Sequence, residues 1–147
     1  MVGEARSHGW TALLPVVHTQ AEVRRPRVLA YVRQDSDLEV VQQTDLIEDF
    51  DIQAIDIKWQ GTLQRTVRVI NIYNAPTGGG PYAVNKLEQL HLDPVTPTII
   101  TGDWNLKHPR YRAIPEGQNA NERVEHMVEW LDANGFVLQN EWNQETW

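Results

Sequence analysis

A short apolar segment that ends in polar residues restricts the fold of this chain more than any other part. Residues 98 to 105 read Thr-Ile-Ile-Thr-Gly-Asp-Trp-Asn. The two isoleucines after a proline predict a buried strand, and Gly102 predicts where the backbone leaves the sheet. Asp103 and Asn105 then stand at the carboxyl end of the strand, where α/β proteins bind ligands. An Asx turn that closes the strand explains the same two residues, because Asp and Asn favour such turns.

The segments before this strand predict a sheet with one parallel pair. Residues 51 to 59 and 66 to 73 have the apolar patterns of strands, and the turn between them favours an antiparallel hairpin. Residues 82 to 90 predict a short helix, with two leucines three apart on one face. A strand, helix, strand crossover is right-handed and makes its strands parallel. We therefore expect Tyr73 and Asp103 to emerge at the same edge of the sheet.

Further elements are expected on both sides of this unit. They are strands at residues 27 to 33, 39 to 43 and 136 to 138, and a helix at residues 121 to 134. The helix has a stripe of apolar residues at helical spacing, and Gly135 is placed to cap its end. Residues 1 to 25 show no clear period. We expect one domain, at residues 26 to 147.

Charge and composition limit the class of protein. The formal net charge of −7 argues against a broad basic face that coats DNA, but a hydrolase that holds one phosphodiester needs only a local positive site. Basic residues gather at residues 24 to 27 and again between Lys107 and Arg112; a solvated loop or phosphate contacts would explain the second group. Without cysteines, a signal-peptide pattern or a membrane-length apolar run, the chain is expected to be intracellular and away from membranes.

Two motifs resemble those of a known superfamily. Residues 102 to 111, Gly-Asp-Trp-Asn-Leu-Lys-His-Pro-Arg-Tyr, resemble the Gly-Asp-Phe-Asn-x-His-His-x-x-Trp signature of the endonuclease/exonuclease/phosphatase superfamily, in the form found in non-LTR (LINE-type) retrotransposon endonucleases. The residues that match are Gly102, Asp103, Asn105 and His108, while Trp104, Lys107 and Tyr111 depart from it. Residues 67 to 76 resemble the strand of that superfamily that ends in a phosphate-contacting Tyr and a Pro-containing loop.

The resemblance implies a fold, an activity and roles for single residues. The fold would be part of a four-layer α/β sandwich, with mixed sheets flanked by helices. The activity would be metal-dependent hydrolysis of a phosphodiester in DNA, and a nuclear location would be compatible with it. Asp103 would hold the attacking water, Tyr73 and Asn105 would donate hydrogen bonds to phosphate oxygens, and His108 would shuttle a proton. The expected contacts to phosphate or nucleic acid are Asn74, Lys107, Arg110 and Arg112.

The metal ligands of the superfamily have no counterpart in this sequence. Its early Glu, its first-strand Asn and its late Asp-His pair, which serve Mg²⁺ or Mn²⁺, are not found. We therefore expect a partial domain with little magnesium-dependent nuclease activity, whose uncovered apolar sheet face lets the chain associate with itself. Two other functions stay open. One is a phosphatase of a small phosphorylated molecule, and the other is a non-catalytic interaction domain that keeps the fold.

Overall fold

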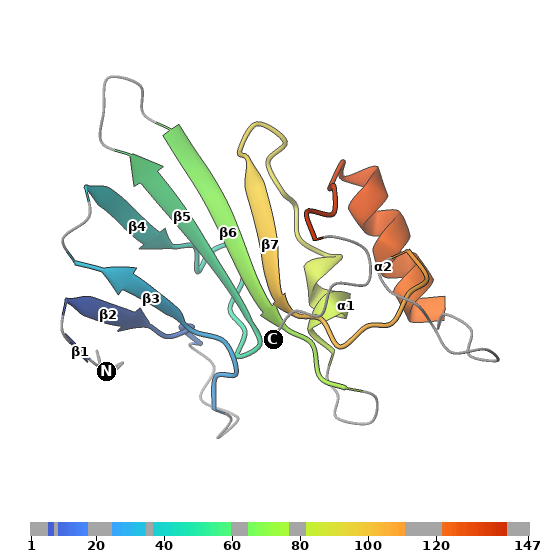
Figure 1. Cartoon of the computed structure of the whole chain (residues 1–147), viewed down its shortest axis with the longest axis horizontal. Helices are drawn as coiled ribbons and strands as arrows, with labels where there is room; N and C mark the ends of the chain where they lie inside the picture. The colour runs from blue at the N-terminus through green and yellow to red at the C-terminus, as the bar shows by residue number, and fades with distance from the viewer. Residues whose placement is uncertain are drawn as a thin grey trace.

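The chain forms two β-sheets and two helices. The computed structural model describes residues 6–7, 9–17, 25–34, 37–59, 65–76, 82–110 and 122–140. Within them are seven strands and two helices, with the helices beside the larger sheet (Figure 1). The α/β content expected from the sequence is confirmed. Neither of these helices is long and apolar enough to cross a membrane.

The smaller sheet is antiparallel and joins the N-terminal stretch to the rest of the chain. Its strands are β1 (Arg6–Ser7), β2 (Trp10–Leu13) and β3 (Ala30–Arg33), in that order. The strand expected at residues 27 to 33 forms only in its second half. Its first half is held elsewhere, because the Arg27 backbone N–H donates to the carbonyl of Phe50 at 2.9 Å.

The larger sheet contains the predicted hairpin and the predicted crossover. Its strands are β4 (Leu38–Gln42), β5 (Ile52–Trp59), β6 (Arg65–Tyr73) and β7 (Thr98–Asp103), in spatial order. The first three are antiparallel, and β6 pairs with β7 in parallel. The connection from β6 to β7 carries α1 (Ala83–Leu87). Both predictions are therefore confirmed, and β6 lies inside the sheet as expected.

The hydrophobic core lies between this sheet and the helices. It is built from Ile52, Ala54, Ile70 and Ile72 of the sheet, Ala83, Val84 and Leu87 of α1, and Met127 of α2 (Glu122–Ala133). Because side chains alternate along a strand, these sheet residues share one face, which we call the helix face. At the end of α2, Gly135 has a φ of +71°, and the Phe136 N–H donates to the Leu131 carbonyl at 2.9 Å. The helix and its glycine cap are confirmed.

The strand predicted at residues 136 to 138 is wrong. Among the described residues, this segment has no regular secondary structure and pairs with no strand. The Phe136 ring stacks on Trp130 of α2 with 5.8 Å between ring centroids. The segment therefore folds back on its own helix instead of joining the sheet.

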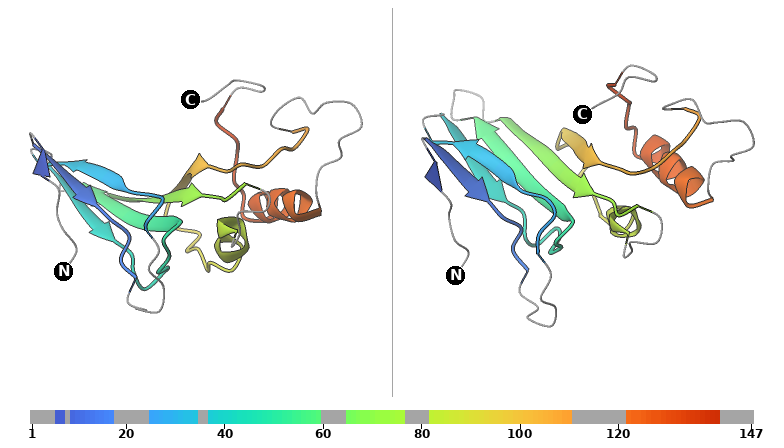
Figure 2. Two further views of the ribbon diagram at one scale, coloured as in Figure 1. Left: turned by 90° about the horizontal axis from the view of Figure 1, so that it is seen from below. Right: turned by 60° about the horizontal axis from the view of Figure 1, so that its bottom comes forward.

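The opposite face of the larger sheet is only partly covered. Gln53 and Asn71 on this face donate to the carbonyls of Leu13 and Leu29, at 2.9 and 3.2 Å. The smaller sheet and the segments that flank it therefore cover the β4 and β5 side, while the helices lie on the β6 and β7 side of the molecule (Figure 2). Ile99 of β7 is 56% exposed. The expected burial of this residue is wrong, because β7 is an edge strand beyond the cover of the smaller sheet.

Candidate functional site

The carboxyl ends of β6 and β7 bring Tyr73 and Asp103 side by side. The two residues are register partners in the parallel pair, and the Asn74 N–H donates to the Asp103 carbonyl at 2.8 Å. Partners in a ladder point to the same face, which here is the face opposite the helices. The prediction that both residues emerge at one edge of the sheet is confirmed.

Gly102 lets β7 approach β6 closely just before Asp103. Its φ is +133°, and a Cβ placed there would lie 1.9 Å from the carbonyl oxygen of Ile72. A side chain would therefore push the strands apart at the site, and glycine is required for two independent reasons. The sequence predicted that the backbone leaves the sheet at Gly102. The close approach of the two backbones explains why this position needs a glycine.

The turn after β7 fixes both Asp103 and Asn105. Asn105 has a φ of +46°, and its backbone N–H donates to Asp103 Oδ1 at 3.2 Å, which is an Asx turn. Its side-chain Nδ2 donates to the carbonyl of Asn74 at 2.9 Å. The Asx turn that the sequence offered as an explanation of Asp103 and Asn105 is therefore confirmed. It leaves room for a ligand, because a carboxylate accepts several hydrogen bonds and an amide nitrogen carries two protons.

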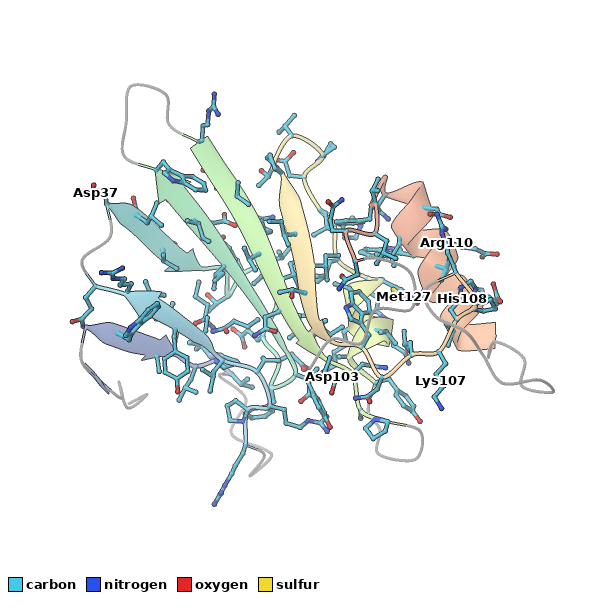
Figure 3. The ribbon with its side chains drawn as sticks, in the orientation of Figure 1. Asp37, Asp103, Lys107, His108, Arg110 and Met127 are labelled. Atoms are coloured by element: carbon cyan, nitrogen blue, oxygen red, sulfur yellow. The ribbon has the colours of Figure 1, made fainter. Side chains whose placement is uncertain are left out.

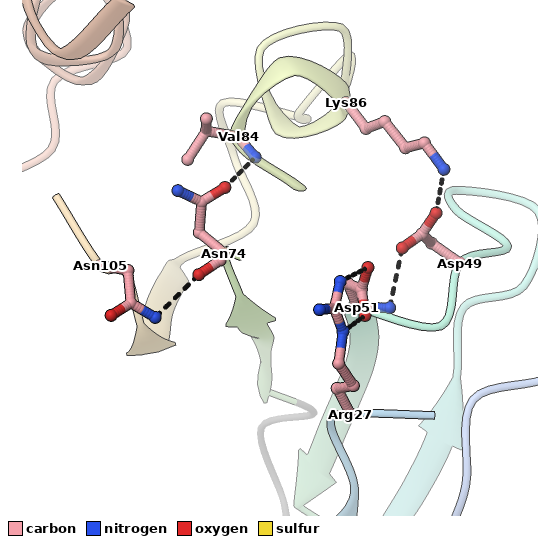
Figure 4. Close-up of polar contacts among 7 residues, drawn as sticks. All are labelled: Arg27, Asp49, Asp51, Asn74, Val84, Lys86 and Asn105. Atoms are coloured by element: carbon pink, nitrogen blue, oxygen red, sulfur yellow. Dashed lines mark hydrogen bonds and ion pairs between the residues drawn. The ribbon is translucent and has the colours of Figure 1, made fainter. Parts of the chain in front are cut away.

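Asn74 is a buried support beneath this turn. It is 1% exposed, its Nδ2 donates to the Trp104 carbonyl at 2.9 Å, and its Oδ1 accepts the Val84 N–H of α1 at 3.3 Å (Figure 4). One side chain thus joins β6, the loop after β7 and the start of α1. The phosphate contact expected of Asn74 stays a prediction, since its amide here serves the fold.

His108 and Arg110 lie against α2, away from Asp103 (Figure 3). His108 Nδ1 accepts the Arg110 backbone N–H at 3.1 Å, and its Nε2 lies 3.2 Å from Glu125 Oε2. An Nδ1 that accepts a hydrogen bond leaves the proton on Nε2, which then donates to the carboxylate. Arg110 Nη1 pairs with Asp132 Oδ2 at 2.5 Å. Both residues therefore fasten the loop to α2, and their expected roles stay predictions.

Two further basic residues were expected near the phosphate. Lys107 is exposed and projects from the loop that leads away from Asp103 (Figure 3). Arg112 lies outside the described residues. The phosphate contacts expected of Lys107 and Arg112 therefore stay predictions.

An ion pair beside Tyr73 was not expected from the sequence. Nε and Nη2 of Arg27 each lie 2.5 Å from an oxygen of Asp51, which is 2% exposed (Figure 4). The guanidinium carbon also lies 4.5 Å from the centroid of the Tyr73 ring. The Tyr73 N–H donates to the Asp51 carbonyl at 2.8 Å. Extension of the predicted hairpin pairing beyond residue 52 would have placed Asp51 beside Tyr73, but no local pattern indicated Arg27.

The hydrogen bonds to Asp51 further favour the charged form of this arginine. The side-chain hydrogen bond to Asp51 raises the pKa of Arg27 above the ordinary arginine value, and this outweighs burial, which acts in the opposite direction. Neighbouring Asp49 accepts the backbone N–H of Asp51 at 2.7 Å and pairs with Lys86 of α1. Both buried acids at this edge are therefore matched by a cation.

The Mg²⁺ or Mn²⁺ implied by the resemblance belongs to the complete domain, and its ligands have no counterpart in this sequence. Mg²⁺ prefers carboxylate oxygens and water, whereas Asp49 and Asp51 already face Lys86 and Arg27. Within the described ranges, no group of three or more His, Cys, Asp or Glu side chains is arranged to hold a metal ion. The expectation of Mg²⁺ or Mn²⁺ stays a prediction.

Comparison with known proteins leaves the assignment to the site itself. No protein-family model matches the chain, and neither a curated protein nor a solved structure is significantly similar to it. The residues at the ends of β6 and β7 are therefore the basis on which a function is proposed.

Proposed function

We propose that this chain carries part of the site of an endonuclease-type phosphodiester hydrolase, as the resemblance of its two motifs implies. The observation that carries the proposal is the parallel register of β6 and β7, which pairs Tyr73 with Asp103. The Asx turn then places Asn105 next to them. A phenol, a carboxylate and an amide at one sheet edge are groups that can bind a phosphate and its attacking water.

Each residue has one task in this proposal. The Tyr73 hydroxyl donates a hydrogen bond to a phosphate oxygen, and the second amide proton of Asn105 donates to another. Asp103 accepts a hydrogen bond from water and so orients it for attack on phosphorus. These groups bind and orient the reactants, and they supply little positive charge for the oxyanion that develops.

The complete proposal includes a divalent cation, DNA and a larger fold. Mg²⁺ or Mn²⁺ would supply positive charge to the developing oxyanion, and a four-layer sandwich would add a helical layer outside the smaller sheet. The described carboxylates are not arranged for that cation. We therefore expect this chain alone to bind a phosphodiester but to hydrolyse it slowly or not at all.

Binding of a labelled single-stranded DNA oligonucleotide tests the proposal. In fluorescence anisotropy at low salt, Tyr73→Phe should weaken binding roughly tenfold, because a hydrogen bond to a charged group contributes about 1.5 kcal/mol or more. Asp103→Asn should bind at least as well as wild type, because it removes a negative charge beside the phosphate.

The control is Tyr31→Phe, which makes the same change in the other sheet at a residue that is 62% exposed. It should leave the affinity unaltered. Nicking of supercoiled plasmid completes the test. Rapid magnesium-dependent nicking that Asp103→Asn abolishes would show that the chain holds its own cation site. Equal affinity of wild type and Tyr73→Phe would contradict the phosphate site.

A non-catalytic interaction domain is the second candidate, and one observation favours it. On the face opposite the helices, Ile99 is 56% exposed and Trp59 is 44% exposed. An apolar residue exposed on an edge strand, as Ile99 is on β7, favours pairing with another chain. This function needs no cation and no role for Asp103 beyond its turn.

A further inference from the structure

Arg27 is held in one orientation beside the proposed phosphate site. Asp51 grips two of its three guanidinium nitrogens, and the Tyr73 ring lies under the guanidinium carbon at 4.5 Å. Asp51 itself is fixed through its backbone, since its carbonyl accepts the Tyr73 N–H at 2.8 Å. Because Asp51 and the Tyr73 ring already fix this guanidinium, it loses little further conformational entropy when it binds an anion.

The exposed end of this ion pair is its positive end. The Asp51 side chain is 2% exposed, whereas that of Arg27 is 30% exposed. In Figure 4 the guanidinium nitrogen that Asp51 does not hold points to the side on which Asn74 and Asn105 lie. Arginine has five N–H donors, and the grip of Asp51 uses two of them. Donors therefore remain on the edge directed towards the ends of β6 and β7.

A phosphate at Tyr73 needs such a cation. The phosphate would lie next to the carboxylate of Asp103, the register partner of Tyr73, and the two negative charges would repel each other. Asp49 adds little repulsion because it is paired with Lys86. Arginine also matches the geometry of phosphate oxygens better than a point charge does.

We propose that Arg27 is a phosphate-contacting residue of this site, with Asp51 as its positioning residue, and that the phosphate belongs to a nucleic-acid backbone. This inference rests on the proposed function. It extends the site from β6 and β7 to the start of β5.

The test compares two ion pairs between an arginine and an aspartate, one at the site and one between β5 and β6. Arg27→Gln with Asp51→Asn removes the pair at the site, and Arg68→Gln with Asp56→Asn removes a bidentate pair on the helix face, where the nitrogen–oxygen distances are 2.8 and 3.0 Å. Each double change keeps the net charge of the chain and leaves no buried charge unpaired. Binding of the labelled oligonucleotide is measured over a range of salt concentrations.

The salt dependence separates a phosphate contact from a structural role. We expect Arg27→Gln with Asp51→Asn to weaken binding at least about fivefold and to reduce the slope of log affinity against log salt by about 0.7, the value for one lost contact to single-stranded DNA. The Arg68 and Asp56 control should retain the wild-type slope. If the first double variant fails to fold, Arg27→Lys replaces it. Lysine keeps the positive charge but cannot make the two parallel hydrogen bonds of a guanidinium. This variant should therefore bind more weakly, while the slope of log affinity against log salt stays that of wild type.

Two results would overturn the inference. If Tyr73→Phe weakens binding but the Arg27 variants change neither affinity nor slope, Arg27 has only a structural role and the proposed function stands. If wild type binds no oligonucleotide even at low salt, the proposed function and the inference fail together.

Discussion

Among single residues, Gly102 controls how closely β7 approaches β6 in front of Asp103. A Cβ at this position would lie 1.9 Å from the Ile72 carbonyl oxygen, and the φ of +133° is one that other residues rarely adopt. The same residue therefore determines the spacing of the strands and the direction in which Asp103 leaves the sheet.

Gly102→Ala should destabilise the fold severely. We expect a loss of more than about 3 kcal/mol in the free energy of unfolding, because overlap with backbone atoms adds to backbone strain. Urea titration followed by circular dichroism measures the loss.

The matched control is Gly135→Ala. Gly135 also has a positive φ, of +71°, but a Cβ there would meet nothing within 4 Å. Its cost should be only about 1 kcal/mol, from strain alone. Equal losses at the two glycines would show that the close approach of β7 to β6 does not exist in solution.

At the level of elements, the strands and helices with strong periodicity could be predicted from sequence. The hairpin of β5 and β6, the crossover to β7 and the long helix α2 all follow from apolar spacing and turn residues. The segment at residues 136 to 138 could not, because its apolar residues fit a strand as well as a helix-capping tail. In the structure the Phe136 ring stacks on Trp130, so this segment packs against α2 and forms no strand.

In the candidate site too, some residues could be predicted from the local sequence pattern and others could not. Tyr73 and Asp103 could be placed together because the handedness of a crossover is general. Arg27 could not, because it reaches Asp51 from a distant part of the chain. Asn74 was expected to contact phosphate or nucleic acid, and the structure shows that its amide joins α1 to the loop after β7. Neither contact has a signature in the local sequence.

At the scale of the whole molecule, the β7 side of the larger sheet exposes an apolar edge strand. Ile99 of β7 is exposed there, and β7 has one edge that pairs with no other described strand. Exposed apolar edge strands promote association between chains. We therefore keep self-association as a proposal for this surface.

Ile99→Lys should reduce self-association in sedimentation velocity. Each copy that buries Ile99 gains roughly 1–2 kcal/mol, and a lysine at the edge strand opposes pairing. Wild type should show concentration-dependent sedimentation that shifts towards monomer in the variant. Val95→Lys is the control, since Val95 is 82% exposed in a turn before β7. Monomeric wild type at all concentrations would refute the proposal.

The central claim is that Tyr73, Asp103 and Arg27 line one phosphate site. The most direct test is a titration of ¹⁵N-labelled protein with the single-stranded oligonucleotide, followed by amide and arginine Nε–H chemical shifts. We predict that the shifts concentrate at Tyr73, at residues 103 to 105 and at the Nε–H of Arg27, and that the Nε–H of Arg68 on the helix face is unmoved. Shifts confined to other surfaces, or no shifts at low salt, would contradict the account.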